Sequence, residues 1–407
     1  MDVGDARTIG RRLYQIRSSR GKSLRVVAGL AGMSTTQLWR IEHGERALDS
    51  LSEIVALADA LQIAPSEVMR LPVPAPANGK TDSAINAVFL ALMAARRSRP
   101  GGQVSPVEAL RARVMATVEA HCRCDRSGEV GAVLPSLVRD LHTSIAAGRD
   151  VAELLELAVL LHSNATVGWL RVVGPGAIEL REMAAELAFG AAEQRDTPEA
   201  RGLAVWGGLY VMVAAGAVDL ARAELDSVSV PTRTPEGMQL EGTLALCRSF
   251  LAAMDSRHGD VDASLEYAAE LAARTGEVNA YGLGFGPQDV GQWRMRALLE
   301  TGDHELSIRV AEGLRPETHL LRSRQVDYWV TYGQALARLR GRHEDAAMAL
   351  RRAEVLSPHS VLRDPITREV VGELLTRARR DSPAGRTLRR MAYRAGLPGV
   401  AQPGAPG

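Results

Sequence analysis

The chain has 407 residues, 46% of them hydrophobic, and a formal net charge of +1, so it can form more than one domain and is not a polycation. Any affinity for nucleic acid must therefore come from a local concentration of charge. Aromatic residues make up only 4%, and the abundance of Ala, Leu, Arg and Glu favours helices over strands. Three cysteines give no disulfide framework, and the sequence shows neither an apolar signal segment nor an apolar run approaching the roughly 20 residues that span a bilayer. We expect an all-α cytoplasmic protein.

The first seventy or so residues predict five short helices. Apolar Ile9, Leu13 and Ile16 lie on one helical face. Ser23 and Ser34 are suited to cap the second and third helices, and glycines follow both. The tight turn between these two helices predicts a helix-turn-helix. The expected helices cover 9–19, 24–31, 35–43, 51–61 and a short segment from 65.

The stretch 23–68 resembles the helix-turn-helix domain of Cro and the phage repressors, often called the XRE family. The matching features are Ala28, the turn Gly32, Ser34, Leu38, Ile41, Glu42, Gly44 and the segment LADALQI. The resemblance covers roughly residues 7–71. It implies that the third helix enters the major groove of DNA and that Glu42 forms an ion pair with Arg17.

One face of the third helix is expected to contact DNA. Arginine can donate two hydrogen bonds to guanine, and threonine offers a hydroxyl and a methyl group to thymine. We therefore predict that Arg40, Thr36 and Thr35 read bases, in that order. Trp39 is expected to pack either on the sugar-phosphate backbone or against the linker. The remaining candidates for DNA contact are Ser34, Gln37, His43, Arg25, Lys22, Arg46 and Arg12.

Positive charge is concentrated in this region. Between Arg7 and Arg46, nine basic residues face two acidic ones, which gives a local charge of +7. Such a run is often only a solvated helix face. Within a helix-turn-helix, it indicates contacts with phosphates instead.

A linker should follow the small domain. Pro72, Pro74 and Pro76 remove backbone donors, and Gly79 adds freedom, so we predict that no helix passes through. The sequence thus divides into a DNA-binding domain (1–71), a proline-rich linker (72–83) and a helical domain (84–407).

The long domain repeats with a period near forty residues. Glycines at the repeated turns are separated by 42, 43, 43 and 39 residues and are Gly174, Gly216, Gly259, Gly302 and Gly341. This period is typical of a solenoid of helix pairs. We predict a tetratricopeptide-like α-solenoid with six or seven pairs between 84 and 396 that serves in sensing or dimerisation.

The segments GFGPQDVGQWRMRALLETGD, QVDYWVTYGQALARLRGRHEDAAMALRRAEVL and LRRMAYRAGL resemble actinobacterial regulators that join an XRE domain to a tetratricopeptide-like domain. This resemblance spans nearly the whole chain and implies a transcription factor. Peptide-pheromone regulators of Gram-positive bacteria share the layout of DNA-binding head, linker and helical repeats. Stacked helix pairs leave a concave face suited to a peptide or small molecule.

Polar and aromatic residues on or beside the first helices of the pairs are candidates for lining that face. Packing between repeats is the alternative role for each aromatic. The candidates are Asn164, Trp169, Trp206, Tyr210, Phe285, Gln288, Asp289, Trp293, Arg296, Gln325, Tyr328 and Trp329.

Two short motifs suggest chemistry that their context does not support. GLGFGP (282–287) lacks the preceding strand and the Lys-Ser/Thr ending of a phosphate loop, and Pro287 is better placed to begin a helix. HCRC (121–124) is too compact for its three soft side chains to ligate one ion from a single helix.

Together these features predict a DNA-binding transcriptional regulator, dimeric on an operator, with a small-molecule or peptide effector. We expect no enzymatic activity, cofactor, metal or membrane partner. The alternative is an adaptor that the head recruits to DNA while the repeats hold a partner protein.

Overall fold

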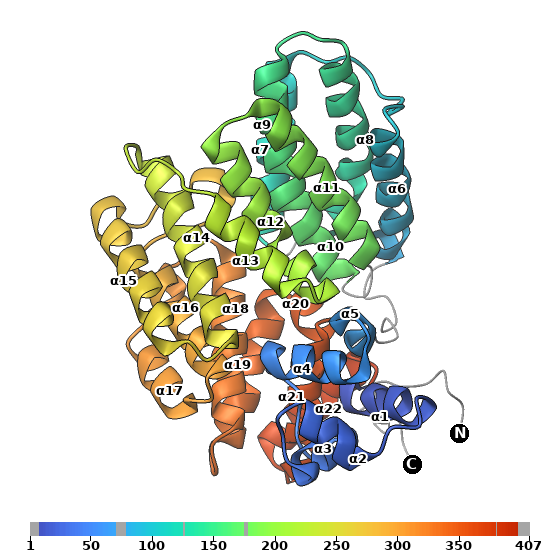
Figure 1. The fold of residues 1–407 in the computed structure, drawn as a ribbon, viewed down its shortest axis with the longest axis vertical. Helices are drawn as coiled ribbons and strands as arrows, with labels where there is room; N and C mark the ends of the chain where they lie inside the picture. Colours follow the sequence, from blue (N-terminus) through green and yellow to red (C-terminus); the bar gives the residue numbers. More distant parts are fainter. Residues whose placement is uncertain (1–7, 71–78, 125–126, 175–177, 380, 398–407) are drawn as a thin grey trace.

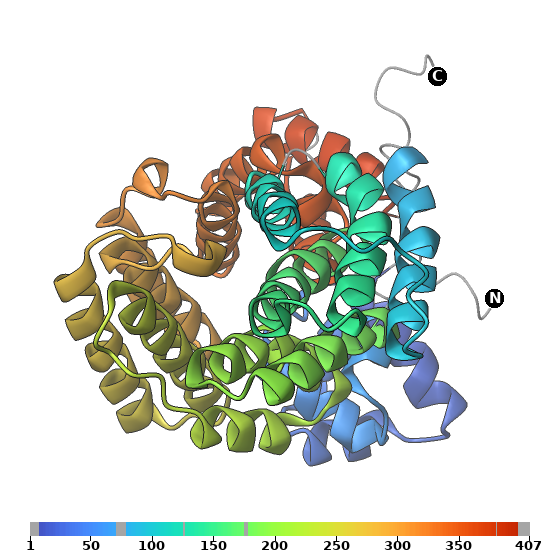
Figure 2. The same ribbon diagram turned by 90° about the horizontal axis from the view of Figure 1, so that it is seen from above.

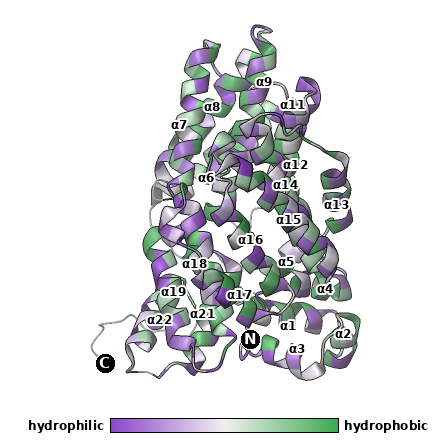
Figure 3. Cartoon of the chain, turned by 90° about the vertical axis from the view of Figure 1, so that its left-hand side faces the viewer, coloured by the Kyte–Doolittle hydropathy of each residue, from purple (hydrophilic) through white to green (hydrophobic). Residues whose placement is uncertain are grey.

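The computed structural model describes residues 8–70, 79–124, 127–174, 178–379 and 381–397. Their regular secondary structure is helical, apart from an isolated bridge between Val278 and Phe285. The all-α prediction is confirmed. Figure 3 shows hydrophobic and hydrophilic residues alternating along the helices, as expected of helices that bury one face. Among the described helices, none is both long and apolar enough to cross a bilayer.

The five helices predicted for the head are all present. They are α1 (Ile9–Ser19), α2 (Leu24–Leu30), α3 (Thr35–Glu42), α4 (Leu51–Leu61) and α5 (Pro65–Met69).

Local capping explains where α2 and α3 begin. The Ser23 side chain accepts from the backbone N–H of Val26. Ser34 accepts from the N–H of Gln37, whose side chain accepts from the Ser34 N–H, so α3 begins with a capping box. Gly32 in the intervening turn has φ +68°, a conformation that glycine adopts without strain.

The head has its own apolar core and a buried ion pair. Val27, Leu38 and Ile41 are fully buried between the helices. Arg17 Nε and Nη2 donate to Glu42 Oε1 and Oε2 at 2.6 and 2.8 Å, which confirms the pairing that the family resemblance implied. This bidentate bond ties α1 to the last residue of α3.

Residues 71–78, with the three linker prolines, lie outside the described residues. Helix α6 (Gly79–Arg96) begins inside the segment predicted to be a linker, so the prediction was wrong for residues 79–83. Ala84, Val88, Ala91 and Leu92 are buried on one face of α6. Burial of this face stabilises the helix, which begins at Gly79, about one turn before the predicted end of the linker at residue 83.

Antiparallel helices form the rest of the chain. The first group comprises α7 (Val107–Cys122), α8 (Ser127–Ala146), α9 (Val151–Leu160), a π-helical segment (Leu161–Thr166), α10 (Val167–Val173), α11 (Ile178–Arg195), α12 (Pro198–Ala215), α13 (Val218–Ser227), α14 (Pro235–Met254) and α15 (His258–Thr275).

The second group completes the repeat array. The helices are α16 (Pro287–Glu300), α17 (His304–Glu312), α18 (Arg322–Ala337), α19 (His343–Leu356), α20 (Pro358–Leu362), α21 (Pro365–Arg377) and α22 (Pro383–Arg394). A short 3-10 segment, Ala280–Gly282, precedes the group, and a second, Pro316–Thr318, lies between α17 and α18.

The predicted turn glycines mark most of the turns. Gly216, Gly302 and Gly341 have φ of +88°, +83° and +80° between paired helices. Gly259 instead lies in the first turn of α15, and the left-handed residue of that turn is Ser256. Figure 2 shows the pairs curving around a central space, as a solenoid does. Pro287 occupies the first turn of α16, as predicted.

The head packs directly against the helical domain. Figure 1 shows α1–α5 at one end of the molecule, next to α21. The core of the head forms one continuous apolar cluster with residues of the long domain. Ala47, from the loop after α3, is buried in a second cluster, with residues of α18, α19, α21 and α22. The two parts therefore share buried apolar surface.

Candidate nucleic-acid interface and adjacent cavity

Helix α3 presents the predicted reading face to solvent. Thr35, Thr36 and Arg40 are exposed, whereas Leu38 and Ile41 on the opposite face are fully buried. Among the described residues, the Arg40 guanidinium has no hydrogen-bond or ion-pair partner. Its N–H donors are thus free for an external acceptor.

An ordered aromatic pair borders this face. The rings of Trp39 and His43 stack with centroids 4.1 Å apart and planes 22° apart. His43 Nδ1 lies 2.7 Å from the carbonyl oxygen of Trp39. Trp39 is 42% exposed, so its free surface can meet a sugar-phosphate chain. The alternative contact, with the linker, falls on residues that are not described.

The basic candidates divide by their internal contacts. Arg25 is exposed and has no partner in the described part of the chain. Lys22 Nζ donates to Ala60 O at 2.7 Å, and two arginines form ion pairs, Arg12 with Glu67 at 3.5 Å and Arg46 with Glu53 at 2.7 Å. Arg7 lies outside the described residues. The side chain of Arg25 is therefore the most available in this group, and phosphate contact stays a prediction for all of them.

The segment 45–52, here called the docking loop, joins α3 to the first turn of α4 and faces the helical domain. Arg338, the residue after α18, pairs with Asp49 at 2.5 Å and with Glu373 of α21 at 2.7 Å. Glu373 also accepts from the backbone N–H of Ala47 at 2.7 Å. The three charged side chains are nearly buried, so this is a polar cluster inside the interface.

Two head helices begin on carboxylates of the helical domain. Glu300, the last residue of α16, accepts from the N–H groups of Leu51 and Ser52 at 3.1 and 3.2 Å and from the Ser50 hydroxyl at 2.9 Å. Glu369 accepts from the N–H of Ile9, the first residue of α1. Such N–H groups have no partner within their own helix, and a carboxylate there also meets the positive end of the helix dipole.

Burial of these carboxylates has an electrostatic cost. Desolvation raises the pKa of Glu300, and it raises the pKa of Glu369 to about 7. The hydrogen bonds from the head act in the opposite direction for both groups. The head thus supplies the donors that these buried acids require.

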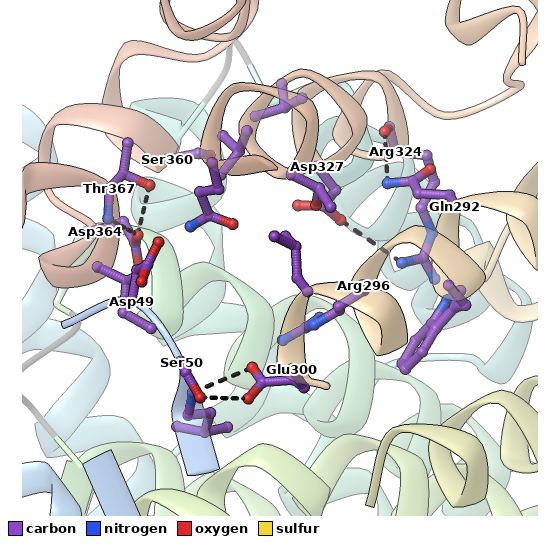
Figure 4. Close-up of a pocket in the computed structure, with 18 of the residues that line it drawn as sticks. Asp49, Ser50, Gln292, Arg296, Glu300, Arg324, Asp327, Ser360, Asp364 and Thr367 are labelled. Atoms are coloured by element: carbon purple, nitrogen blue, oxygen red, sulfur yellow. Dashed lines mark hydrogen bonds and ion pairs between the residues drawn. The ribbon is translucent and has the colours of Figure 1, made fainter. Parts of the chain in front are cut away.

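A cavity of about 310 Å³ lies behind the docking loop. Figure 4 shows Ser50, Arg296, Glu300, Asp327 and Asp364 around one space, where elements from distant parts of the chain meet. Of the twelve ligand candidates from the sequence, Trp293 and Arg296 line this cavity.

The other candidates lie elsewhere. Trp169, Phe285 and Tyr328 are buried in apolar clusters, and the π-helical Asn164 donates to Tyr281 O at 2.7 Å. Gln325 and Trp329 line a separate groove on the outside of α18 and α19. Of the remaining candidates, Trp206 and Tyr210 pack against the apolar core. Gln288 and Asp289 make polar contacts within the protein.

Residues 8–71 match the family described as helix-turn-helix domain. The head is a helix-turn-helix domain. No curated protein matches the chain. Among solved structures, the apo form of the competence regulator ComR from Streptococcus vestibularis is 13% identical over 97% of this chain and 100% of that chain. Its TM-score of 0.22 is too low to support conclusions about this protein.

Proposed function

We propose that the protein is a sequence-specific DNA-binding transcriptional regulator of the XRE type, acting in the cytoplasm as a homodimer and not as an enzyme. The observation that carries this proposal is the reading face of α3. Arg40 is exposed and unpaired beside exposed Thr36, in a domain that matches the helix-turn-helix family. An arginine that approaches guanine in this way discriminates against other bases by about 1–3 kcal/mol.

The docked position of the head is compatible with this role. The helical domain holds the head through the N-termini of α1 and α4 and through the docking loop. Thr35, Thr36 and Arg40 remain exposed in the same arrangement. Docking therefore leaves these side chains uncovered.

Dimerisation follows from the small size of one head. A single recognition helix reads few base pairs, so helix-turn-helix proteins combine two half-sites about one helical turn apart. The helical domain would hold two heads at that spacing and respond to a small-molecule or peptide effector. The cavity between the docking loop and the repeats supports a ligand-responsive role.

The test is to select DNA fragments that bind the full-length protein and then compare variants by fluorescence anisotropy. Arg40→Ala should weaken binding to the selected operator about 5- to 100-fold and relax the preference at one base pair. Arg97→Ala makes the same charge change at an exposed site in the turn after α6 and should bind as the wild type does. Equal losses on operator and random DNA would refute base reading by Arg40. Failure of the wild-type protein to enrich any fragment would refute the function.

A further inference from the structure

The five carboxylates that line the docking-loop cavity all have polar partners within the protein. Glu300 and Asp364 accept from helix N-termini, and two others form ion pairs, Asp49 with Arg338 and Asp327 with Arg324. Glu53, the fifth, pairs with Arg46.

Two arginines on the cavity wall lack such partners. Among the described residues, neither Arg171 nor Arg296 makes a hydrogen bond or an ion pair. The lining holds five arginines and five carboxylates, so its formal charge is balanced, and Glu300 and Asp364 offset Arg171 and Arg296 only at longer range. The N–H donors of these two arginines are therefore available to an anion, and Arg296 is also half-buried.

Aromatic rings hold Arg296 in position. Its guanidinium carbon lies 4.9, 4.4 and 5.6 Å from the ring centres of Tyr210, Phe250 and Trp293. Stacking on rings uses the faces of the guanidinium and leaves its edge N–H groups free to bind a carboxylate or phosphate bidentately. The pre-positioned group loses less conformational entropy on binding than a free arginine would.

A second polar group points to the rest of the ligand. Gln292, also on the wall, is 5% exposed and donates through Nε2 to Arg324 O at 3.0 Å. Its Oε1 is buried and has no hydrogen-bond partner. Nδ1 of His304 on the same wall is likewise buried without a partner. An unpaired buried acceptor destabilises a fold by about 1–3 kcal/mol unless a donor reaches it.

We propose that this cavity binds a small organic acid that carries a hydroxyl or amine donor, with its carboxylate held by Arg296 and Arg171 and its donor facing Gln292. The volume of about 310 Å³ lies at the small end of the range of about 300–1,000 Å³ for ligand sites. This inference deepens the proposed function by naming the class of effector and its site.

The site is adjacent to the docking contacts. Arg296 and Glu300 are four residues apart on α16, so they share a helix face. Glu300 caps α4 of the head, and Asp49 and Ser50 of the docking loop form part of the cavity wall. The cavity wall thus includes residues of both the head and the repeats, so a ligand that fills it can contact both.

The test is calorimetric titration of the full-length protein with lactate, malate, citrate, serine and glutamate. Acetate, which lacks the donor, and glycerol, which lacks the charge, are controls. At least one of the five should bind with a Kd below about 1 mM, a useful affinity for a metabolite sensor, and more tightly than either control. Arg296→Met should weaken that binding about 10- to 100-fold, as expected for a charged hydrogen bond.

Arg171→Met is the second variant, because Arg171 is exposed and its substitution leaves the core intact. This variant should also bind the same ligand more weakly, whereas Arg97→Met should bind it with the wild-type affinity. Absence of binding by all five acids, or equal affinity in the wild type and both variants, would overturn the proposal. Binding of a short peptide through its C-terminal carboxylate, with no binding of the free acids, would overturn the choice of a small acid.

Anisotropy with operator DNA separates this inference from the proposed function. Intact DNA binding without acid binding would refute the cavity proposal alone. Acid binding without any DNA binding would refute the regulator and leave the site.

Discussion

The contact between Asp49 and Arg338 offers a direct test of whether the head is held in the docked position. Asp49 belongs to the docking loop and Arg338 follows the last residue of α18, and their atoms Oδ1 and Nη2 lie 2.5 Å apart. Their side chains are only 10% and 11% exposed, so solvent screens the pair weakly. Asp49→Ala removes the charged partner on the head and leaves Arg338 paired with Glu373 and bonded to the carbonyl oxygen of Ala47 at 3.3 Å.

The magnitude follows from the size of coupling between charged groups in contact. At an effective dielectric constant of about 20, two charges 4 Å apart attract by about 4 kcal/mol, and desolvation offsets part of this. Measured couplings of neighbouring side chains are about 0.5–3 kcal/mol. We expect Asp49→Ala to destabilise docking by about 2 kcal/mol, or roughly 30-fold in the docking equilibrium.

Hydrogen exchange measures this equilibrium at the interface itself. The N–H groups of Ala47, Leu51 and Ser52 donate to carboxylates of the helical domain, so they exchange when the head undocks. Peptides covering 45–53 should exchange about 30-fold faster in Asp49→Ala. A cycle with Arg338→Met and the double variant gives the coupling energy of the pair.

Asp345→Ala is the matched control, because it breaks an exposed ion pair with Arg342 in the helical domain. Exposed pairs contribute about 0–1 kcal/mol, so exchange in 45–53 should stay at the wild-type rate. If peptides covering 45–53 exchange in Asp49→Ala at the wild-type rate, the docking contact is refuted. Equal acceleration throughout the head core would show unfolding of the head instead of undocking.

Two further predictions concern the DNA surface and the pH dependence of docking. Arg25→Ala should weaken binding to operator and random DNA alike and reduce the salt slope by about 1, as measured by anisotropy at several salt concentrations; loss on the operator alone would contradict a phosphate contact. Burial raises the pKa of Glu369 from its ordinary 4.5 to about 7, so docking takes up a proton. The resulting stabilisation is complete below about pH 4.5 and is lost as the pH rises through 7. Protection of the Ile9 N–H, corrected for intrinsic exchange, should be greater at pH 6 than at pH 8. Glu369→Gln leaves in place Glu300, whose pKa is also raised, and His304, whose pKa is lowered, so the variant should show a smaller difference; an unchanged difference in the variant would exclude Glu369 as its source.

The sequence was sufficient for features that depend on short-range interactions. Ser34 and Gln37 are three residues apart, so the capping box at α3 could be predicted from local preference. The buried pair of Arg17 and Glu42 came from family resemblance, because composition and spacing alone do not show which arginine faces the glutamate. The glycine turns set the spacing of the repeats, and three of them have the expected left-handed conformation.

The docking carboxylates could not be predicted in this way. Glu300 lies 250 residues from Ser50, and its charge at the end of an amphipathic helix is typical of a solvated residue. The cavity could not be predicted for the same reason, because its walls come from distant parts of the chain that meet only when the solenoid has curved and the head has packed on it. Aromatic candidates were equally ambiguous. Trp293 lines the cavity and Phe285 is buried in the core. The sequence around them, which is rich in apolar residues, does not distinguish these two roles.

The exposure of α3 restricts how docking can regulate DNA binding. Thr35, Thr36 and Arg40 are exposed while the head is docked, so undocking cannot uncover them. What undocking changes is the orientation of the head, because the contacts at Ile9, Ala47 and Leu51 fix it on the helical domain. A dimer that reads two half-sites requires its heads at a set separation of about 34–36 Å. In a dimer joined through the helical domains, docking would raise operator affinity by fixing that separation, and release of the heads would lower it without altering the contacts that one head makes. Asp49→Ala should then weaken binding to a paired operator more than binding to a single half-site, and equal effects on the two DNAs would contradict this mode of control.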